Sequence, residues 1–155
     1  MDDRKKQAAR QFIAAIPYSR ALGMQLEALE DGAAVISMPY DPRFVGDPQT
    51  GVIHGGAVSA LMDTCGGAAV MSHPTGAIGT ATIDLRIDYM RPARPGDRII
   101  ARAECYHVTR SVAFVRATAH DGDPARPVAA ATGAFTLERA PDRTRKGKAA
   151  AEPRR

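Results

Sequence analysis

The stretch that decides the fold is "GVIHGGAVSALMDTCGGAAV", residues 51–70, in which two glycines after His54 open a long apolar run. The run predicts a helix over 55–72, ended by the turn sequence "HPTG" at 73–76. Apolar residues fall on nearly every side of this helix, which is typical of a helix buried at the centre of a domain. One carboxylate, Asp63, lies in the middle of it.

Asp63 is unusual because burying a carboxylate costs free energy unless the group is paired or hydrated. A solvent-facing position on a partly exposed helix is one interpretation. The other rests on its helical neighbours, which are all small: Ser59, Ala60, Gly66 and Gly67. Each glycine inside a helix costs about 1 kcal/mol relative to alanine. Close approach of a ligand or a second helix would explain that cost, so the pattern favours a groove floor with one reactive group.

The start of the helix has its own chemistry. The first N–H groups of a helix lack intrahelical partners and carry a partial positive charge. Gly55 and Gly56 have no side chains that would block approach to their amides, so the position suits an oxyanion hole for a carbonyl that becomes tetrahedral. A glycine-rich turn selected only for backbone freedom is the alternative interpretation.

The spacing of these groups limits how they can cooperate. Gly55 and Asp63 are eight residues apart, which is about 12 Å along a helix axis. A general base must lie within about 3 Å of the group that it activates. Asp63 therefore cannot serve a carbonyl held at Gly55 of the same chain. If both act on one substrate, two antiparallel copies of the helix must share the site across a dimer interface.

On both sides of this helix the hydrophobic pattern becomes alternating, which predicts strands. In residues 81–90, Ile83, Leu85, Ile87 and Tyr89 form one face and charged residues the other. The further predictions are a helix over 4–16 ended by Pro17, two strands in 24–40 around an Asp31-Gly32 turn, a loop over 41–53, and strands in 98–108, 111–120 and 127–138. This order predicts an α+β fold, an antiparallel sheet wrapped around one long central helix.

The length of 155 residues fits one domain. We divide the chain into an N-terminal helix at 1–19, a body at 20–138 and a basic tail at 139–155. The tail holds seven basic and two acidic residues, and the preceding residues hold 14 and 15, so the net charge of +4 belongs to the tail. Its composition predicts disorder. The body is nearly neutral and predicts no nucleic-acid partner.

Two well-separated cysteines, Cys65 and Cys105, provide no disulfide framework and indicate a reducing compartment. The N-terminal residues are charged and do not resemble a signal peptide. The apolar run around 57–71 is too short to span a bilayer. These features predict a cytoplasmic protein without a membrane partner. Cys65 has no nearby histidine in sequence, so we do not assign it as a nucleophile.

Three elements in this order resemble the hotdog-fold acyl-CoA thioesterases of the phenylacetate-pathway (PaaI-like) family: "GVIHGG", an aspartate nine positions after the histidine, and "TIDLRIDYMRPARPGD". The resemblance covers roughly residues 20–138. It implies the hotdog fold, hydrolysis of an acyl-CoA thioester, and dimers or dimers of dimers with active sites at the dimer interface. It implies no metal and no cofactor beyond the CoA of the substrate.

By position, the resemblance implies that the Gly55 amide polarises the thioester carbonyl, with Gly56 beside it, and that His54 supports this loop or contacts the substrate. Asp63 of a second chain would be general base or nucleophile, and Thr82 would help to place Asp63 or the water. The resemblance also implies pantetheine- and phosphate-facing positions at Arg91, Arg94, Arg110 and Ser111. Ordinary solvated turn residues are the alternative for these four positions.

One departure concerns the residues before "HGG". Relatives commonly carry an asparagine at the position of Pro48, and proline has no side-chain donor. A role for that asparagine must be absent or filled by Asp47 or Gln49. The departure keeps open an acyl-CoA binding module without turnover. A hydratase or dehydratase of the same fold is the third alternative, although His54 and Asp63 lie too far apart within one chain for a shared proton transfer.

Overall fold

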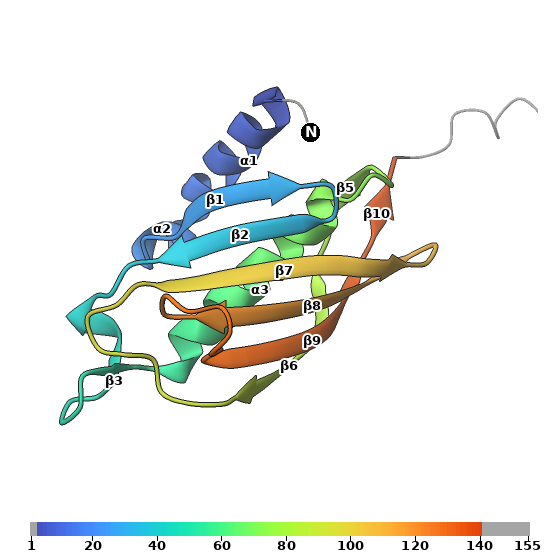
Figure 1. The fold of residues 1–155 in the computed structure, drawn as a ribbon. Coiled ribbons are helices and arrows are strands. Elements are labelled where there is room, and N and C mark those ends of the chain that lie inside the picture. The colour runs from blue at the N-terminus through green and yellow to red at the C-terminus, as the bar shows by residue number, and fades with distance from the viewer. Residues whose placement is uncertain (1–2, 141–155) are drawn as a thin grey trace, which may run out of the picture.

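The structure is a computed structural model that describes residues 3–140. Six antiparallel strands form its main sheet in the order β1-β2-β7-β8-β9-β6 (Figure 1). Their bounds are β1 Gln25–Glu30, β2 Ala33–Met38, β6 Thr82–Tyr89, β7 Ile99–Val108, β8 Val112–His120 and β9 Ala129–Thr136. The helix α3, Gly55–Ser72, packs across one face of this sheet. The predicted antiparallel sheet around one long helix is therefore confirmed, and so are the bounds of that helix.

The core lies between α3 and the central strands. Leu61, Met62 and Cys65 on α3 are fully buried, and they face a sheet surface that alternates as predicted. Along β7, Ile99, Ala101, Ala103 and Cys105 point into this core and the residues between them are more exposed. Alternation places every second side chain on one face of a strand, so small alanines on the sheet let the helix approach closely. The hydrophobic effect of this layer fixes α3, and with it Asp63.

The strand β6 is the edge of the sheet and differs from its predicted burial. It pairs with β9 alone within the six-stranded sheet. Leu85 and Ile87 are half-buried, as expected for the apolar face, but Ile83 is 57% exposed and Tyr89 50% exposed. The predicted alternation of β6 is confirmed in the middle of the strand, whereas the apolar side chains at its two ends are exposed. An edge strand with exposed apolar side chains is a surface open to pairing.

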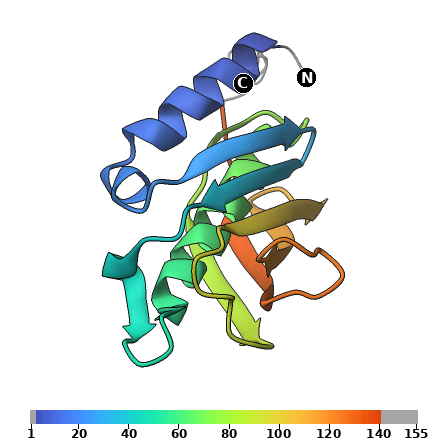
Figure 2. The same cartoon turned by 60° about the vertical axis from the view of Figure 1, so that its left-hand side comes forward.

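The connections contain short elements that the sequence pattern does not indicate. Residues 41–53 contain the 3-10 helix Pro42–Phe44 and a small hairpin of β3, Val45–Asp47, and β4, Val52–Ile53. A further pair joins β5, Ala77–Gly79, to β10, Glu138–Arg139. Strands of two or three residues are too short to show a period of two. The β3–β4 hairpin extends away from the sheet in both views (Figures 1 and 2).

Two helices precede the sheet. The first, α1, spans Asp3–Ala15, and α2 spans Pro17–Ala21 with the proline at its start. Pro17 ends the predicted helix and also begins the next one, because the first turn of a helix needs no N–H donor there. The helix α1 packs against β1, and Figure 2 shows the two elements side by side. Ile13 is buried in the same core as α3, so this helix is part of the folded body.

The predicted division of the chain at residue 138 falls inside β10, which continues to Arg139. Residues 141–155, which make up most of the predicted basic tail, lie outside the described residues. Among the helices within residues 3–140, none combines the length and the apolarity that crossing a bilayer requires.

Candidate active site

Asp63 and Thr82 are brought together by α3 and β6. The Thr82 hydroxyl donates a hydrogen bond of 2.6 Å to Asp63 Oδ1. Asp63 is half-buried on the side of α3 that faces the edge strand β6. A short hydrogen bond to a carboxylate is charge-assisted and fixes its orientation. The second carboxylate oxygen has no hydrogen-bond partner within residues 3–140 and could act on a water or a substrate.

A large apolar cavity, of about 870 Å³, opens beside this pair. Its wall combines α3, β5 and the N-terminal helices. The lining residues used below are Ala9, Ile13, Ile16, Asp63, Gly67, Met71, Ile78, Thr82 and Phe135. The volume lies within the usual range for small-molecule sites, and an apolar pocket with a few polar groups is the common pattern for such sites. Asp63 and Thr82 therefore form a polar group at one end of a cavity that is otherwise mostly apolar.

The two glycines beside Asp63 have different roles. A methyl group at Gly66 would lie 2.8 Å from the ring of Phe135, so this glycine lets α3 approach the sheet. At Gly67 the nearest atom to such a methyl is Thr80 Cγ2 at 3.9 Å, and Gly67 lines the large cavity. The interpretation of both glycines as a groove floor is therefore correct for Gly67 and wrong for Gly66, which packs in the core.

The start of α3 is capped by His54. Its Nδ1 accepts a hydrogen bond of 2.8 Å from the Gly56 N–H. An accepting Nδ1 leaves the proton of a neutral imidazole on Nε2. The Gly56 amide is thus used by the cap, while Gly55 occupies the first helical position, where the amide has no intrahelical partner. Gly46 allows this approach, because a methyl group there would lie 2.8 Å from the His54 Cα.

Tyr89, which is predicted from its alternation only to lie on a strand face, holds the same turn from the other side. Its hydroxyl donates a hydrogen bond of 2.7 Å to the Gly55 carbonyl oxygen, and it lies 2.5 Å from Ser59 Oγ. A methyl group at Gly55 would meet the Tyr89 ring at 3.3 Å. The local sequence contains no signal for this contact, because Tyr89 lies 34 residues along the chain.

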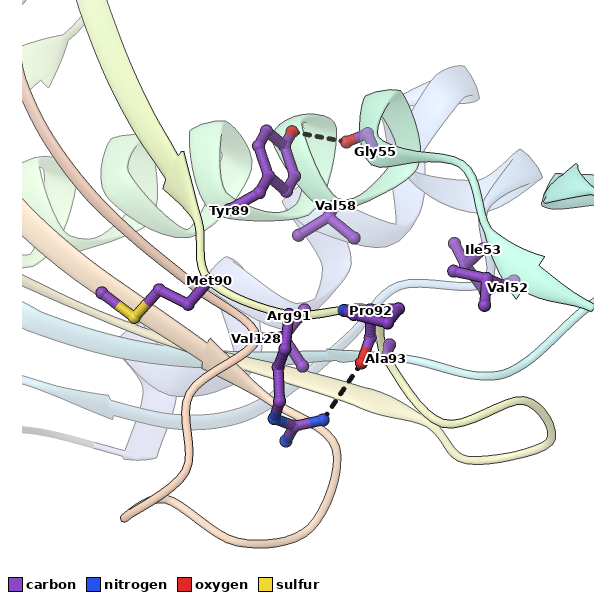
Figure 3. A pocket seen from close by; sticks show the side chains of 10 residues that line it. All are labelled: Val52, Ile53, Gly55, Val58, Tyr89, Met90, Arg91, Pro92, Ala93 and Val128. Atoms are coloured by element: carbon purple, nitrogen blue, oxygen red, sulfur yellow. Dashed lines mark hydrogen bonds between the residues drawn. The ribbon is translucent and has the colours of Figure 1, made fainter. Parts of the chain in front are cut away.

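Gly55 and Tyr89 border a second, smaller cavity of about 310 Å³ (Figure 3). Its other walls come from β4, from α3 and from the segment after β6: Val52, Ile53, Val58, Met90, Arg91, Pro92, Ala93 and Val128. Asp63 lines the large cavity and Gly55 the small one, so the structure does not bring these two residues together within one chain. This agrees with the separation expected from their spacing on one helix.

The Arg91 guanidinium is already paired. Figure 3 shows it extending away from Gly55 to the Pro92 carbonyl, and it forms two hydrogen bonds, of 2.6 and 2.8 Å, with Asp121. Asp121 is 1% exposed and also accepts from the Arg94 N–H. The Arg91 guanidinium beside it lowers the pKa of Asp121 strongly, against the opposing effect of burial. Asp121 thus ties the turn after β8 to the turn after β6, a role that no local pattern indicates.

The remaining predicted site residues lie on exposed turns. The Arg94 side chain is 63% exposed and forms an ion pair of 3.0 Å with Asp97. Arg110 and Ser111 are exposed between β7 and β8. These three residues are placed where solvent and a large polar ligand have access, and they line neither cavity.

The turn that carries Pro48 is held by its own side chains. Asp47 accepts hydrogen bonds from the Gln49 N–H and the Thr50 hydroxyl, and the hydroxyl contact of 2.6 Å is the main reason that the pKa of Asp47 is lowered. Pro48 and Gln49 are exposed at the tip of the β3–β4 hairpin. Neither Asp47 nor Gln49 lies beside Gly55 or Asp63 in either cavity.

Cys65 is enclosed in the core. Its sulfur lies 3.3 Å from the Ala34 carbonyl oxygen and 3.4 Å from that of Ala101. Burial raises the pKa of Cys65 to about 12. Since the thiolate is the reactive form, this residue has no nucleophilic role.

Comparison with known proteins agrees with this architecture. The sequence profile of the Thioesterase superfamily matches residues 50–128, about half of the chain. The medium/long-chain acyl-CoA thioesterase YigI of Escherichia coli K12 is 30% identical over 85% of this chain and 92% of that protein. The acyl-coenzyme A thioesterase PaaI of the same organism is 30% identical over a shorter part, 57% of this chain and 60% of PaaI.

A protein from Pseudomonas aeruginosa with a known crystal structure has 39% sequence identity and a TM-score of 0.76, covering 85% of this chain and 98% of that one. The resemblance stated from the sequence is confirmed at the level of the superfamily, and the match to YigI spans more of the chain than the match to PaaI. The chain belongs to the Thioesterase superfamily and has the hotdog fold.

Proposed function

We propose that this protein hydrolyses acyl-CoA thioesters to a free carboxylic acid and CoA, at a site completed by two copies of the chain. The observation that carries the proposal is the Asp63 carboxylate, oriented by Thr82 at the polar end of an apolar cavity. The names of the relatives YigI and PaaI, both acyl-CoA thioesterases, support the same reaction.

In this mechanism the Gly55 N–H of one copy donates to the thioester carbonyl oxygen, and Asp63 of the other copy accepts a proton from a water molecule. The water oxygen attacks the carbonyl carbon, and the negative charge that develops on the carbonyl oxygen is stabilised by the amide. Collapse of the tetrahedral intermediate breaks the carbon–sulfur bond. The thiolate of CoA takes the proton back from Asp63, which leaves the acid, the thiol and the carboxylate as at the start.

The need for two copies follows from the separate positions of the two groups. Asp63 and Gly55 border different cavities, two helical turns apart. The free edge of β6, with Ile83 and Met90 each 57% exposed, is an apolar surface suited to pairing with its own copy. Such antiparallel pairing would run the two α3 helices in opposite directions, so that Asp63 of each approaches Gly55 of the other.

The exposed basic residues have a role in the same proposal. Arg94 and Arg110 carry charges that suit the phosphates of CoA, and Ser111 and Gln49 would add hydrogen bonds. Arg91 supports the turn through Asp121 and would contribute to binding through its position beside the small cavity. His54, with its proton on Nε2, presents a donor next to Gly55.

The test is release of thiol from a series of acyl-CoA esters by the wild-type protein and the Asp63→Asn variant. We expect turnover by the wild type and a fall of at least about 100-fold in kcat for the variant. Asp123→Asn is the matched control, because Asp123 is exposed in the turn after β8 and lines neither cavity. Saturable binding of acyl-CoA without release of thiol would instead establish a binding module.

A mixing experiment tests whether the site is shared. The variants Asp63→Asn and Gly55→Val are each expected to be inactive, since valine at Gly55 meets the Tyr89 ring and shields the amide. In an equimolar mixture of exchanged dimers, half of the molecules are mixed and each holds one intact site, which gives about one quarter of wild-type activity. A mixture that stays inactive after verified exchange would assign each site to a single chain.

A further inference from the structure

We propose that the N-terminal helix α1 and the turn after it form the far wall of the acyl-binding channel and set the length of acyl chain that this protein accepts. The inference rests on the proposed function, since it places the acyl tail of the thioester in the large cavity. It assigns a specificity role to a segment that the resemblance to thioesterases, at residues 20–138, does not cover.

The cavity runs along α3 away from Asp63. Asp63, Gly67 and Met71 line it at intervals of four residues, so they form one row on the helix surface. Ser72, at the end of α3, also lines it. Asp63 and Ser72 are nine residue steps apart on α3, which is about 13.5 Å along the helix axis, the length of roughly ten carbons of an extended acyl chain. The cavity is therefore long enough to hold more than a short acyl group.

The chemistry of the lining changes along this row. Asp63 and Thr82 form a polar pair at one position, whereas Met71, Ile78 and Phe135 supply apolar surface. A thioester has the same order of groups, a polar carbonyl joined to a hydrocarbon tail. Binding of the tail in this space would place the carbonyl end beside Asp63, and each buried methylene group would add a favourable hydrophobic contribution.

The N-terminal segment, which packs against β1, forms one wall of the cavity. Ala9, Ile13 and Ile16 all line it; Ala9 and Ile13 lie one turn apart on α1, and Ile16 lies in the turn between α1 and α2. Ile13 is buried, while Ala9 and Ile16 are partly exposed. The wall thus has one anchoring residue and two positions at which a larger side chain reduces the cavity without removing a core contact.

Two substitutions test the wall from different positions. Ile16→Trp and Ala9→Phe both fill the space, and Gln11→Phe, on the exposed side of the same helix, is the matched control. We expect kcat/KM for dodecanoyl-CoA to fall at least tenfold in the first two variants, since each methylene group that no longer fits costs about fourfold. The value for butanoyl-CoA should stay within about twofold of the wild type.

A smaller side chain in this wall should shift the preference of the protein towards longer acyl chains. Ile16→Ala enlarges the cavity, so we expect hexadecanoyl-CoA to gain relative to dodecanoyl-CoA. The assignment of this wall would be overturned if kcat/KM fell equally for short and long acyl-CoA substrates. It would also be overturned if the ratio of kcat/KM between short and long substrates stayed unchanged in all variants. Thermal unfolding of each variant checks the fold, and the ratio of two substrates in one preparation is independent of the amount of folded protein.

A binding measurement separates this inference from the proposed reaction. The non-hydrolysable thioether S-dodecyl-CoA and its short homologue S-ethyl-CoA are titrated into wild type and Ile16→Trp by calorimetry. A selective loss of affinity for the dodecyl compound supports the channel even for a protein that releases no thiol. If thiol is released but the two compounds respond equally to the substitution, the reaction stands and the channel wall is wrong.

Discussion

The Tyr89 hydroxyl donates a 2.7 Å hydrogen bond to the carbonyl oxygen of Gly55, which joins the free edge of the sheet to the first turn of the central helix. The same peptide unit is held from its other side, because the Gly56 N–H donates to His54 Nδ1. The Gly55–Gly56 peptide is therefore fixed at both its oxygen and its nitrogen. This orientation also sets the direction of the preceding amide, that of Gly55, which the proposed reaction uses.

Removal of the Tyr89 hydroxyl should weaken this orientation. In Tyr89→Phe the ring still packs against Gly55, while the hydrogen bond to its carbonyl is lost. We expect kcat to fall about fivefold to twelvefold, in line with one hydrogen bond of about 1–1.5 kcal/mol, with little change in KM. Steady-state thiol release measures both constants. Tyr106→Phe is a suitable control, because Tyr106 is exposed on β7 and lines neither cavity.

Thr82 should act through the orientation of Asp63. Thr82→Val keeps the shape of the side chain but removes its 2.6 Å hydrogen bond to the carboxylate. We expect kcat to fall at least tenfold, since hydrogen bonds to charged groups contribute about 1.5–3 kcal/mol. Thr82→Ser retains the hydroxyl and should stay within about threefold of the wild type. Equal kcat values for the valine and serine variants would show that the hydroxyl has no role in turnover.

Asp121 should contribute to stability in a pH-dependent way. Asp121→Asn leaves Arg91 and the Arg94 amide without their buried carboxylate, and we expect a loss of about 3 kcal/mol in the free energy of unfolding at pH 7. The pKa of Asp121 is lowered in the folded state, so its contribution is complete above the unfolded pKa of about 4 and decreases as the pH falls below that value.

Urea unfolding of wild type and variant at several pH values measures this contribution. The difference between the two proteins should be largest at pH 5–7 and should shrink towards pH 2. Asp97→Asn is the control, since its pair with Arg94 is exposed and should contribute less than about 1 kcal/mol. A difference that is constant from pH 7 to pH 2 would contradict the buried ionic role of Asp121.

The two adjacent glycines of α3 should respond differently to the same substitution. Alanine at Gly66 adds a methyl group 2.8 Å from the buried Phe135 ring, whereas alanine at Gly67 meets only Thr80 at 3.9 Å. Overpacking costs about 1–3 kcal/mol, and both variants gain the same helix propensity. We therefore expect Gly66→Ala to be less stable than Gly67→Ala by about this amount, as measured by chemical denaturation. Equal stabilities would mean that the core accommodates the methyl group.

The sequence predicts the parts of this fold that depend on local pattern. The bounds of α3 follow from its glycine start and its apolar run, and the strands follow from alternation. The Asp31-Gly32 turn is predicted because glycine readily adopts positive φ values, and Gly32 has a φ of 78° in the structure. The separation of Asp63 from Gly55 follows from helix geometry alone, so the proposal of a site shared by two copies rests on the spacing of these residues in the sequence.

Contacts between distant segments could not be predicted in the same way. The local sequence around Arg91 indicates an unpaired turn residue. In the structure Arg91 pairs with Asp121, which lies 30 residues further along the chain. Gly66 and Gly67 are identical in local context, and only the position of Phe135 distinguishes them. Tyr89 shares the apolar face of its strand, but its contact with Gly55 depends on where α3 begins relative to the end of β6. Each of these roles depends on a partner that the local pattern does not contain.

The place of β6 in the sheet has a consequence for how the protein is made. This strand is synthesised before β7 and β8, yet its partner is β9, and Asp84 on β6 is bonded to Ala134, 50 residues later. A nascent chain that ends before β9 carries both Asp63 and Thr82 but has no strand that holds them together. Non-local pairing of this kind forms late. We expect the contact between Asp63 and Thr82 to form only when the last long strand has left the ribosome, so that a partly synthesised chain lacks the proposed site.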